Sequence, residues 1–287
     1  MAQVPHFDRV TIIGVGLLGA SLSLALRDKG LSGRITGYGR KPENLQRAKE
    51  AGIIDEYRID AAASVEDADL VVLCTPVGMF TEAVSTIQHA LKKGALVTDV
   101  GSVKGRMVAE IESLMPEGVR FIGSHPIAGG DKSGIDEARK DLFIGARCII
   151  TPTAQSDGDA LDIISSIWRL IDCRVEMMDP FLHDDVFALV SHLPHLIAYA
   201  LVNTVDSIDP DRIDYSGGGF RDSTRIAMSS PELWRDISRF NRENLLNVLD
   251  VFRDNLERIS RCVEDQDWEW LEKEFSRAQK LRLRMNK

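Results

Sequence analysis

One histidine, His125, has the surroundings that a general base needs. It stands in the segment Gly-Ser-His-Pro-Ile-Ala-Gly, residues 123–129, where small neighbours leave room for a ligand. A neutral imidazole near physiological pH is the natural acceptor of a substrate proton. The alternative is a histidine that only hydrogen-bonds within a turn. Because a nucleotide-binding pattern occurs in the same chain, we favour a catalytic role.

A second polar segment, Gly-Ser-Val-Lys at residues 101–104, follows a predicted strand at residues 95–100. In open α/β sheets ligands bind outside the carboxyl ends of the strands, so Ser102 and Lys104 are well placed for ligand contact. Two plainer interpretations stay open: Ser102 is a helix cap, and Lys104 is a surface lysine.

Two histidines flank a proline in the segment Ser-His-Leu-Pro-His, residues 191–195. His192 and His195 stand three apart and share a helix face, so metal ligation has to be considered. No third ligand is evident, and we therefore expect no metal. We expect a structural role for His192 and a contact with substrate or cofactor for His195.

Two arginines, Arg221 and Arg225, lie four apart in Gly-Gly-Gly-Phe-Arg-Asp-Ser-Thr-Arg, residues 217–225. On a helix they would share a face, and paired guanidinium groups suit a carboxylate substrate. The alternative is a solvated basic face, above all for Arg221.

A glycine pattern near the start of the chain predicts a dinucleotide site. Gly14, Gly16 and Gly19 form a G-x-G-x-x-G turn between a predicted strand at residues 10–13 and a predicted helix. The first glycine permits the tight turn, the second lets the backbone approach a pyrophosphate, and the third lets helix and strand pack closely. The helix N-terminus then offers N–H groups to the phosphates.

The cofactor is indicated by the end of the next strand, residues 34–39. An NAD site usually has Asp or Glu there, whereas this chain has Gly39, Arg40 and Lys41. A guanidinium binds a 2′-phosphate, so we favour NADP and keep NAD possible. The alternative is that both cations are simply solvated. The expected cofactor-binding residues are Gly14, Gly16, Leu17, Leu18, Gly19, Gly39, Arg40, Lys41, Thr75 and Pro76.

The elements that must position these residues alternate between strand and helix in the first half and are helical in the second. Strands are predicted at residues 69–76, 95–100, 120–126 and 148–152, with helices at 42–51, 81–91, 105–114 and 159–171. This pattern predicts an α/β fold: an N-terminal Rossmann-type doubly wound parallel sheet at residues 1–175, then an all-helical domain at 176–287. Pro194 is expected to kink a long apolar helix at residues 181–203.

Composition excludes several classes of protein. The 287 residues carry a net charge of −9, which argues against a general nucleic-acid or membrane-surface binder. The four cysteines are scattered, as in a reducing compartment. No signal peptide is evident and no apolar run approaches membrane-spanning length, so we expect a cytoplasmic protein without a membrane partner. Apolar stripes in the helical half favour a homodimer, although they could instead close a monomeric core.

Taken in order after the glycine turn, these four segments resemble the prephenate/arogenate dehydrogenase family of tyrosine biosynthesis. The resemblance covers nearly the whole chain. It implies oxidative decarboxylation of a small-molecule substrate, prephenate to 4-hydroxyphenylpyruvate or arogenate to tyrosine. Hydride leaves the hydroxyl-bearing ring carbon for the nicotinamide, and carbon dioxide leaves the opposite ring carbon.

The resemblance also implies roles for individual residues. His125 would accept the ring hydroxyl's proton, and Ser102 would help to hold that hydroxyl and the histidine. Arg225 would bind the ring carboxylate, with His195 and the glycine backbone positioning the substrate. Asp131 stands where many members have a Glu linked to gating of the pocket. The expected substrate-binding residues are His195, Arg225, Gly217, Gly218, Gly219, Arg221, Asp131 and Trp234.

The alternative enzyme is another two-domain NAD(P)-dependent dehydrogenase, of the 3-hydroxyacid or imine-reducing type. Such enzymes use a lysine or an aspartate on the interdomain helix, where this chain carries Ser-His-Leu-Pro-His. A nucleotide-sensing binding protein would need the fold but not His125. The choice between prephenate and arogenate stays open.

Overall fold

The computed structural model describes residues 5–129 and 134–284. The chain divides into two compact units, Met1–Asn241 and Arg242–Lys287. All the predicted site residues that the structure describes belong to the first unit. The domain boundary predicted between residues 175 and 176 lies inside that unit and stays a prediction.

The first unit is built on one eight-stranded sheet with the strand order β3-β2-β1-β4-β5-β6-β7-β8. Pairing is parallel from β3 to β6 and between β7 and β8, and only the β6–β7 pair is antiparallel. The strands are β1 (Phe7–Ile13), β2 (Ser32–Tyr38), β3 (Glu56–Arg58), β4 (Leu70–Leu73), β5 (Leu96–Asp99), β6 (Arg120–Pro126), β7 (Arg147–Thr151) and β8 (Arg174–Met177).

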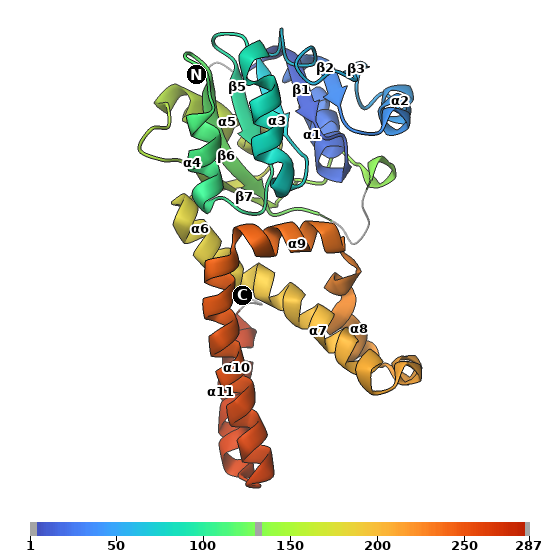
Figure 1. Ribbon diagram of the computed structural model, residues 1–287, viewed down its shortest axis with the longest axis vertical. Helices are drawn as coiled ribbons and strands as arrows, with labels where there is room; N and C mark the ends of the chain where they lie inside the picture. Colours follow the sequence, from blue (N-terminus) through green and yellow to red (C-terminus); the bar gives the residue numbers. More distant parts are fainter. Residues whose placement is uncertain (1–4, 130–133, 285–287) are drawn as a thin grey trace. The chain divides into compact units, whose positions relative to one another are not determined.

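Helices cover both faces of this sheet (Figure 1). They are α1 (Leu17–Asp28), α2 (Pro42–Glu50), α3 (Phe80–Ile87), α4 (Gly105–Ser113) and α5 (Gly158–Leu170), with short 3₁₀ turns η1 (Val77–Met79), η2 (Gln88–Ala90) and η3 (Ile135–Glu137). Strand residues alternate between two hydrophobic clusters, because successive side chains of a strand point to opposite faces. In β4, Leu70 and Val72 join the cluster of α1, α2 and α5, whereas Val71 and Leu73 join the cluster of α3 and α4.

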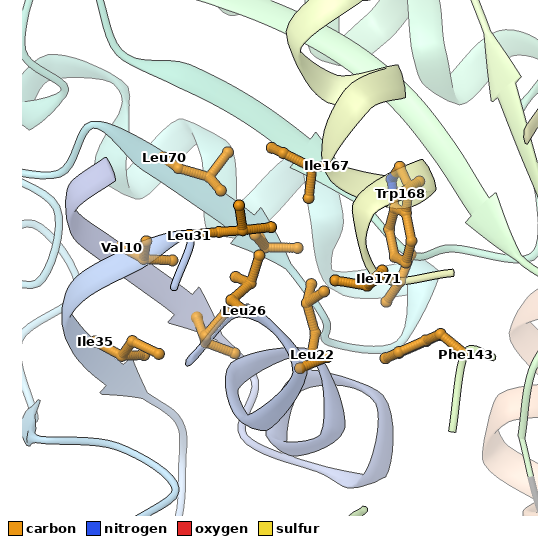
Figure 2. Packing of buried hydrophobic residues seen from close by; sticks show 14 of the residues in the cluster. Val10, Leu22, Leu26, Leu31, Ile35, Leu70, Phe143, Ile167, Trp168 and Ile171 are labelled. Carbon is orange, nitrogen blue, oxygen red and sulfur yellow. The ribbon is translucent and has the colours of Figure 1, made fainter. Parts of the chain in front are cut away.

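The larger cluster anchors the glycine turn. Leu22 and Leu26 of α1 belong to the same cluster as Ile167 of α5, and Trp168 meets Phe143 edge-on with ring centroids 5.4 Å apart (Figure 2). All five side chains are buried. The turn that precedes α1 is therefore held on a rigid base.

A helical segment follows β8 within the same unit. It comprises α6 (Pro180–Phe187), a π-helical turn η4 (Ala188–His192), α7 (Leu193–Ile208), the 3₁₀ turn η5 (Pro210–Tyr215), α8 (Gly218–Thr224), the 3₁₀ turn η6 (Arg225–Met228) and α9 (Pro231–Phe240). Asp179 caps α6 by accepting from the N–H groups of Phe181 and Leu182, and Ser230 caps α9 by accepting from Leu233. Pro194 lies in the first turn of α7, directly after the π turn. The predicted break in the long helix is thus a π turn followed by proline.

Helix α9 packs against the turn after β4. An added Cβ at Gly78 would lie 2.5 Å from Asp236 Oδ2, so only glycine lets the two approach. Trp234 and Ile237 of α9 are buried with Val103, which follows β5. These contacts bring the helical segment to the carboxyl ends of the central strands.

The second unit consists of α10 (Arg242–Glu264) and α11 (Trp268–Arg284), which contact each other as a helical pair. Both were expected from apolar residues at helical spacing. The turn between them includes Gln266 in the left-handed conformation.

Three expectations need correction. The antiparallel β6–β7 pair departs from the predicted all-parallel sheet. Strand β8 was not predicted; it spans the expected domain boundary between residues 175 and 176 and extends the sheet to Met177. The 29-residue segment Pro180–Ile208 contains an 18-residue stretch with mean hydropathy 1.5 and is long and apolar enough to cross a membrane, contrary to the expectation that no run is. By itself that is weak evidence for a span, because a core helix passes the same test.

Candidate active site

The glycine turn has the geometry that a dinucleotide requires. Gly14 has φ +100°, and an added Cβ would lie 2.7 Å from the Cys74 carbonyl carbon. At Gly19 an added Cβ would lie 2.4 Å from the Gly14 carbonyl oxygen, whereas at Gly16 nothing lies within 4 Å. Two glycines therefore permit close packing, and the third leaves open space at the N-terminus of α1. Backbone N–H groups there can bind a phosphate.

A cavity of about 320 Å³ opens beside this turn. Seven of the ten residues predicted for the cofactor line it: Gly14, Gly16, Gly39, Arg40, Lys41, Thr75 and Pro76. The buried hydroxyl oxygen of Thr75 has no hydrogen-bond partner among the described atoms, so it is available to a ligand. Leu17, Leu18 and Gly19 are not in the lining; the two leucines pack against the core instead.

The far end of the cavity is locally basic. Arg40 and Lys41 follow β2, both are exposed, and Lys41 is the N-cap residue of α2. Asn44, which the sequence analysis did not select, also lines the cavity and supplies an amide. An added Cβ at Gly39 would meet Leu45 only at 3.6 Å, an ordinary contact. Glycine at position 39 is thus not a steric requirement.

His125 is the last residue but one of β6, within the strand predicted at residues 120–126. It is 8% exposed, and its Nδ1 lies 2.8 Å from Nε2 of His183. Burial lowers the pKa of His125 well below its usual 6.5. Repulsion by His183 when it is protonated, by Lys104, and by His192 when it is protonated lowers this pKa further. The imidazole is therefore neutral, as a proton acceptor must be.

Lys104 is the clearest error among the predicted alternatives, because it is fully buried rather than on the surface. Its Nζ pairs with Asp99, which is also fully buried. The Asp99 carboxylate accepts further hydrogen bonds from the N–H groups of Gly101, at 2.8 Å, and Ser124, at 3.0 Å. The ion pair links the end of β5 to the N-terminus of α4, and the Ser124 hydrogen bond links β5 to β6 next to His125.

His183 and Asp184 of α6 complete the surroundings of His125. Nδ1 of His183 lies 2.8 Å from Oδ1 of Asp184, which also accepts from the Lys104 N–H at 2.7 Å. The Phe187 ring packs against both imidazoles, with centroids 5.0 Å from His125 and 4.4 Å from His183. Burial lowers the pKa of His183, against the opposing effect of Asp184.

A second pair of histidines gathers around Trp234. The His195 ring stacks on Trp234 with centroids 3.6 Å apart, and His192 meets the same indole edge-on at 5.9 Å. Nδ1 of His195 donates to the Ser191 carbonyl at 2.9 Å, which leaves its Nε2 as an acceptor. His192 is buried and hydrogen-bonds the Asn241 amide at 3.0 Å, as expected of a structural histidine.

The arginines do not share one α-helix face. Helix α8 ends at Thr224, and Arg225 begins the 3₁₀ turn η6, so the predicted spacing of Arg221 and Arg225 on a single helix is wrong. Arg221 is exposed and reaches the Ser216 hydroxyl at 3.4 Å. Positive charge at Arg225 contributes, after burial, to lowering the pKa of His195, which places the two near each other.

The three glycines start α8, with Gly217 as its N-cap residue and Gly218 and Gly219 in the first turn. Nothing lies within 4 Å of an added Cβ at any of them. All three glycines are exposed, so the backbone at the start of α8 is accessible to a substrate.

Ser102 is half-buried between β5 and α4, and it does not cap the helix, because Lys104 is the N-cap residue. Asp131 lies outside the described residues. Within residues 5–129 and 134–284, no group of three or more His, Cys, Asp or Glu side chains is arranged to hold a metal ion.

Sequence reasoning missed His183, Asp184 and Asp99. His183 and His125 are 58 residues apart, and no motif connects them. Their meeting depends on the packing of α6 against α4, which a pattern of types and spacings does not encode. Asp99 was visible at the end of a predicted strand, but the sequence gave no reason to pair it with Lys104.

Taken together, a glycine turn, an adjoining cavity and a neutral buried histidine at the carboxyl edge of one sheet define a dinucleotide-dependent oxidoreductase. The family of that enzyme comes from comparison with known proteins. The sequence model for the nucleotide-binding domain of prephenate dehydrogenase matches residues 22–177, and that for its dimerization domain matches residues 179–277. The chain therefore belongs to the prephenate dehydrogenase family.

Individual relatives agree with this assignment. The cyclohexadienyl dehydrogenase of Zymomonas mobilis is 35% identical, over 96% of this chain and 96% of its own. The structure of prephenate dehydrogenase from Aquifex aeolicus with hydroxyphenyl propionate and NAD+ has a TM-score of 0.92 and 38% identity, covering 99% of this chain and 100% of that one. The arogenate dehydrogenase of Synechocystis has a TM-score of 0.79 and 29% identity, covering 96% and 98%.

Proposed function

We propose that this protein oxidatively decarboxylates prephenate to 4-hydroxyphenylpyruvate, arogenate to tyrosine, or both, with NADP as the favoured hydride acceptor. The observation that carries the proposal is His125, a neutral buried base at the carboxyl end of β6, on the sheet edge where the glycine turn also lies. Bound NADP or NAD supplies the site that accepts hydride from the hydroxyl-bearing ring carbon.

His125 removes the proton from the ring hydroxyl while hydride departs from the ring carbon that bears this hydroxyl. The hydroxyl becomes a ketone, carbon dioxide then leaves the opposite ring carbon, and the ring becomes a phenol. Aromatisation supplies a large driving force, so the chain needs mainly to orient the substrate and accept one proton. Ser102, in the loop after the neighbouring strand β5, supplies a hydroxyl to hold the substrate oxygen.

The substrate carboxylate binds at the cationic side of the helical segment. Arg225 supplies a guanidinium for the ring carboxylate, and His195, neutral because burial lowers its pKa, offers Nε2 as a hydrogen-bond acceptor or a contact surface. Trp234 supports the His195 ring by stacking. The free N–H groups at Gly217, Gly218 and Gly219 suit a second anionic group. Arg221, which is exposed, contributes long-range attraction.

NADP is favoured because the end of the cavity that receives the adenosine ribose is cationic. Arg40 and Lys41 line it, and no acidic residue follows β2 to bind a ribose 2′-hydroxyl before α2 begins. A 2′-phosphate meets two positive charges and the Asn44 amide there. NAD lacks the group that these side chains would bind.

We also propose a homodimer formed through the helical segment. Large apolar side chains of α6 and η4 are exposed, among them Phe181, Leu182, Leu189 and Val190. An apolar face of this kind fits a helix that packs on a second copy. The matched family domain is described as a dimerization domain, which supports the same conclusion.

The test is the initial rate of reduced-nicotinamide formation by the purified protein with prephenate or arogenate, each with NADP and NAD. We expect turnover with at least one substrate, faster with NADP, and one carbon dioxide released per nicotinamide reduced. No turnover in any of the four combinations would overturn the proposal. Turnover with NAD alone would keep the reaction and reject the interpretation of Arg40 and Lys41.

The base assignment is tested by His125→Asn. NADP binding should be retained, while kcat falls by about 10²–10⁴-fold, the usual contribution of a positioned acid–base group. His89→Asn is the matched control, since His89 is exposed on η2 and outside the site. Unchanged turnover in His125→Asn would reject His125 as the base.

A further inference from the structure

His125 ends a hydrogen-bonded chain that begins at the N-terminus of α4. Asp184 Oδ1 accepts from the Lys104 N–H at 2.7 Å and lies 2.8 Å from Nδ1 of His183, whose Nε2 lies 2.8 Å from Nδ1 of His125. His183 is fully buried, and Asp184 is 4% exposed. Every member of the chain is thus shielded from water that could supply alternative partners.

Asp184 sits where a carboxylate is stabilised. It accepts from the N-cap residue of α4, and the positive end of the helix dipole favours its negative charge. Gly105 begins α4, and an added Cβ there would lie 2.5 Å from Asp184 Oδ2. The absence of a side chain at position 105 is therefore what admits the carboxylate.

The order of donors along the chain has only one solution for neutral imidazoles. A carboxylate oxygen only accepts, so Nδ1 of His183 carries the proton and donates to Asp184. Nε2 of His183 then has a lone pair and must accept, which places a proton on Nδ1 of His125. A neutral His125 protonated at Nδ1 has its lone pair on Nε2.

We propose that His183 and Asp184 are positioning residues that fix the tautomer of His125, leaving Nε2 as the nitrogen that takes the substrate proton. This rests on the proposed function, because it assigns the atom through which the same base acts. Neither residue needs to touch substrate. When Nε2 accepts the hydroxyl proton, His125 becomes an imidazolium whose Nδ1–H remains bonded to His183, so its positive charge is partly offset by Asp184 through the chain.

Charged and titratable groups from the surrounding elements also face this chain. Lys104 acts on both His125 and His183, His192 acts on His125, and Asp99 acts on His183. Lys104 and His192 disfavour an imidazolium, whereas Asp184 favours one at His183. Burial and these charges keep both imidazoles neutral, which is the state that the donor order requires.

The first readout needs no substrate. Nitrogen NMR of protein labelled in its six histidines distinguishes the two neutral tautomers, and His125→Asn identifies the His125 signals by their loss. We expect His125 and His183 both to be protonated at Nδ1 at neutral pH. A His125 protonated at Nε2 would overturn the proposal even in a fully active enzyme.

The second readout is the kinetic effect of Asp184→Asn. An amide that turns its NH2 group to His183 donates to Nδ1, which moves the His183 proton to Nε2 and the His125 proton to Nε2 as well. An amide that keeps its oxygen at the Oδ1 position preserves the tautomers but removes the negative charge that offsets the imidazolium, so either orientation slows the reaction. We expect kcat to fall by about 10²–10⁴-fold with NADP affinity unchanged, the loss typical of a base held in the wrong tautomer. Asp185→Asn, the same change at the exposed neighbour on α6, should keep wild-type kcat.

Gly105→Ala tests the chain without altering a titratable group, because its Cβ displaces the Asp184 carboxylate. We expect a loss of kcat in the same direction, and a changed His183 signal in the NMR spectrum. If Asp184→Asn fails to fold, the kcat of Gly105→Ala and the NMR spectrum of the wild-type protein still test the positioning role. Wild-type kcat in a folded Asp184→Asn variant would reject the positioning role. If the wild-type protein shows no turnover but His125 is protonated at Nδ1, the proposed function is rejected and the tautomer assignment stands.

Discussion

Replacing Lys104 by methionine tests how much the buried Lys104–Asp99 ion pair contributes to the free energy of unfolding. Lys104 and Asp99 are both fully buried, and the pair links the end of β5 to the N-terminus of α4. Methionine retains most of the aliphatic volume of lysine, so the cavity left behind is small. The substitution therefore removes the charge while largely preserving the packing.

The magnitude follows from what remains around Asp99. Three donors bind its carboxylate, and the variant keeps two of them, the N–H groups of Gly101 and Ser124. Loss of one charge-assisted hydrogen bond costs about 1.5–3 kcal/mol. A buried charge that loses its counterion typically raises the cost to about 3–5 kcal/mol. We expect Lys104→Met to lower the free energy of unfolding by an amount in this higher range.

The assay is guanidinium-induced unfolding, followed by fluorescence and circular dichroism, with Asp99→Asn and the double variant completing a cycle. The double variant should be more stable than Lys104→Met, because no buried charge is left unpaired. The matched control is Lys92→Met, which breaks a half-exposed pair with Asp69 at 2.5 Å and should cost at most about 1 kcal/mol. A Lys104→Met variant as stable as the Lys92→Met control, or a double variant less stable than both singles, would refute the reasoning.

Two further predictions concern cofactor choice and pH. Arg40→Asp should lower the ratio of kcat/KM with NADP to kcat/KM with NAD by about 10–100-fold, because one guanidinium–phosphate bond is worth about 1.5–3 kcal/mol. The control Lys49→Asp, on the exposed face of α2, should leave this ratio unchanged. An unaltered ratio in Arg40→Asp would show that the 2′-phosphate does not bind there. Burial, with positive charge at His183, lowers the pKa of His192 from 6.5 to about 4, so below pH 6.5 the unfolded chain gains a proton that the folded protein does not take up until about pH 4. The free energy of unfolding should therefore decrease as the pH is lowered from 6.5 to 4, by about 3 kcal/mol from His192 alone. Denaturant midpoints that stay constant down to pH 4 would contradict this prediction.

Strong periodic signals predicted much of the fold. The helix predicted at residues 42–51 is α2 (Pro42–Glu50), and Gly52 after it has φ +69°, the conformation expected of a glycine that ends a helix. Strand β8 was missed because its four residues, Arg-Val-Glu-Met, are largely exposed and carry no apolar run. Such edge strands are defined by a pairing partner, here β7, rather than by their own composition.

The cofactor cavity could be predicted because its residues are local to three strand ends. Gly14 follows β1, Gly39 follows β2 and Thr75 follows β4, and parallel strands bring their carboxyl ends to one edge. The surroundings of His125 could not be predicted from the sequence, because they depend on the packing of α6 against α4. The surface alternative for Lys104 is wrong for the same reason: its burial is decided by Asp99 and by a helix that begins more than 70 residues later.

The buried charges explain why the base lies on a strand. His125 on β6 is fixed by the sheet, Asp99 on β5 holds the N–H of Ser124 beside it, and Lys104 neutralises Asp99 while its own N–H binds Asp184. One short segment, residues 99–105, therefore supplies both the buried Lys104–Asp99 ion pair and the helix terminus that binds Asp184. A change in this segment should alter stability and proton transfer together. Lys104→Met should consequently raise the pKa of His125, because it removes one of the positive charges that lower it.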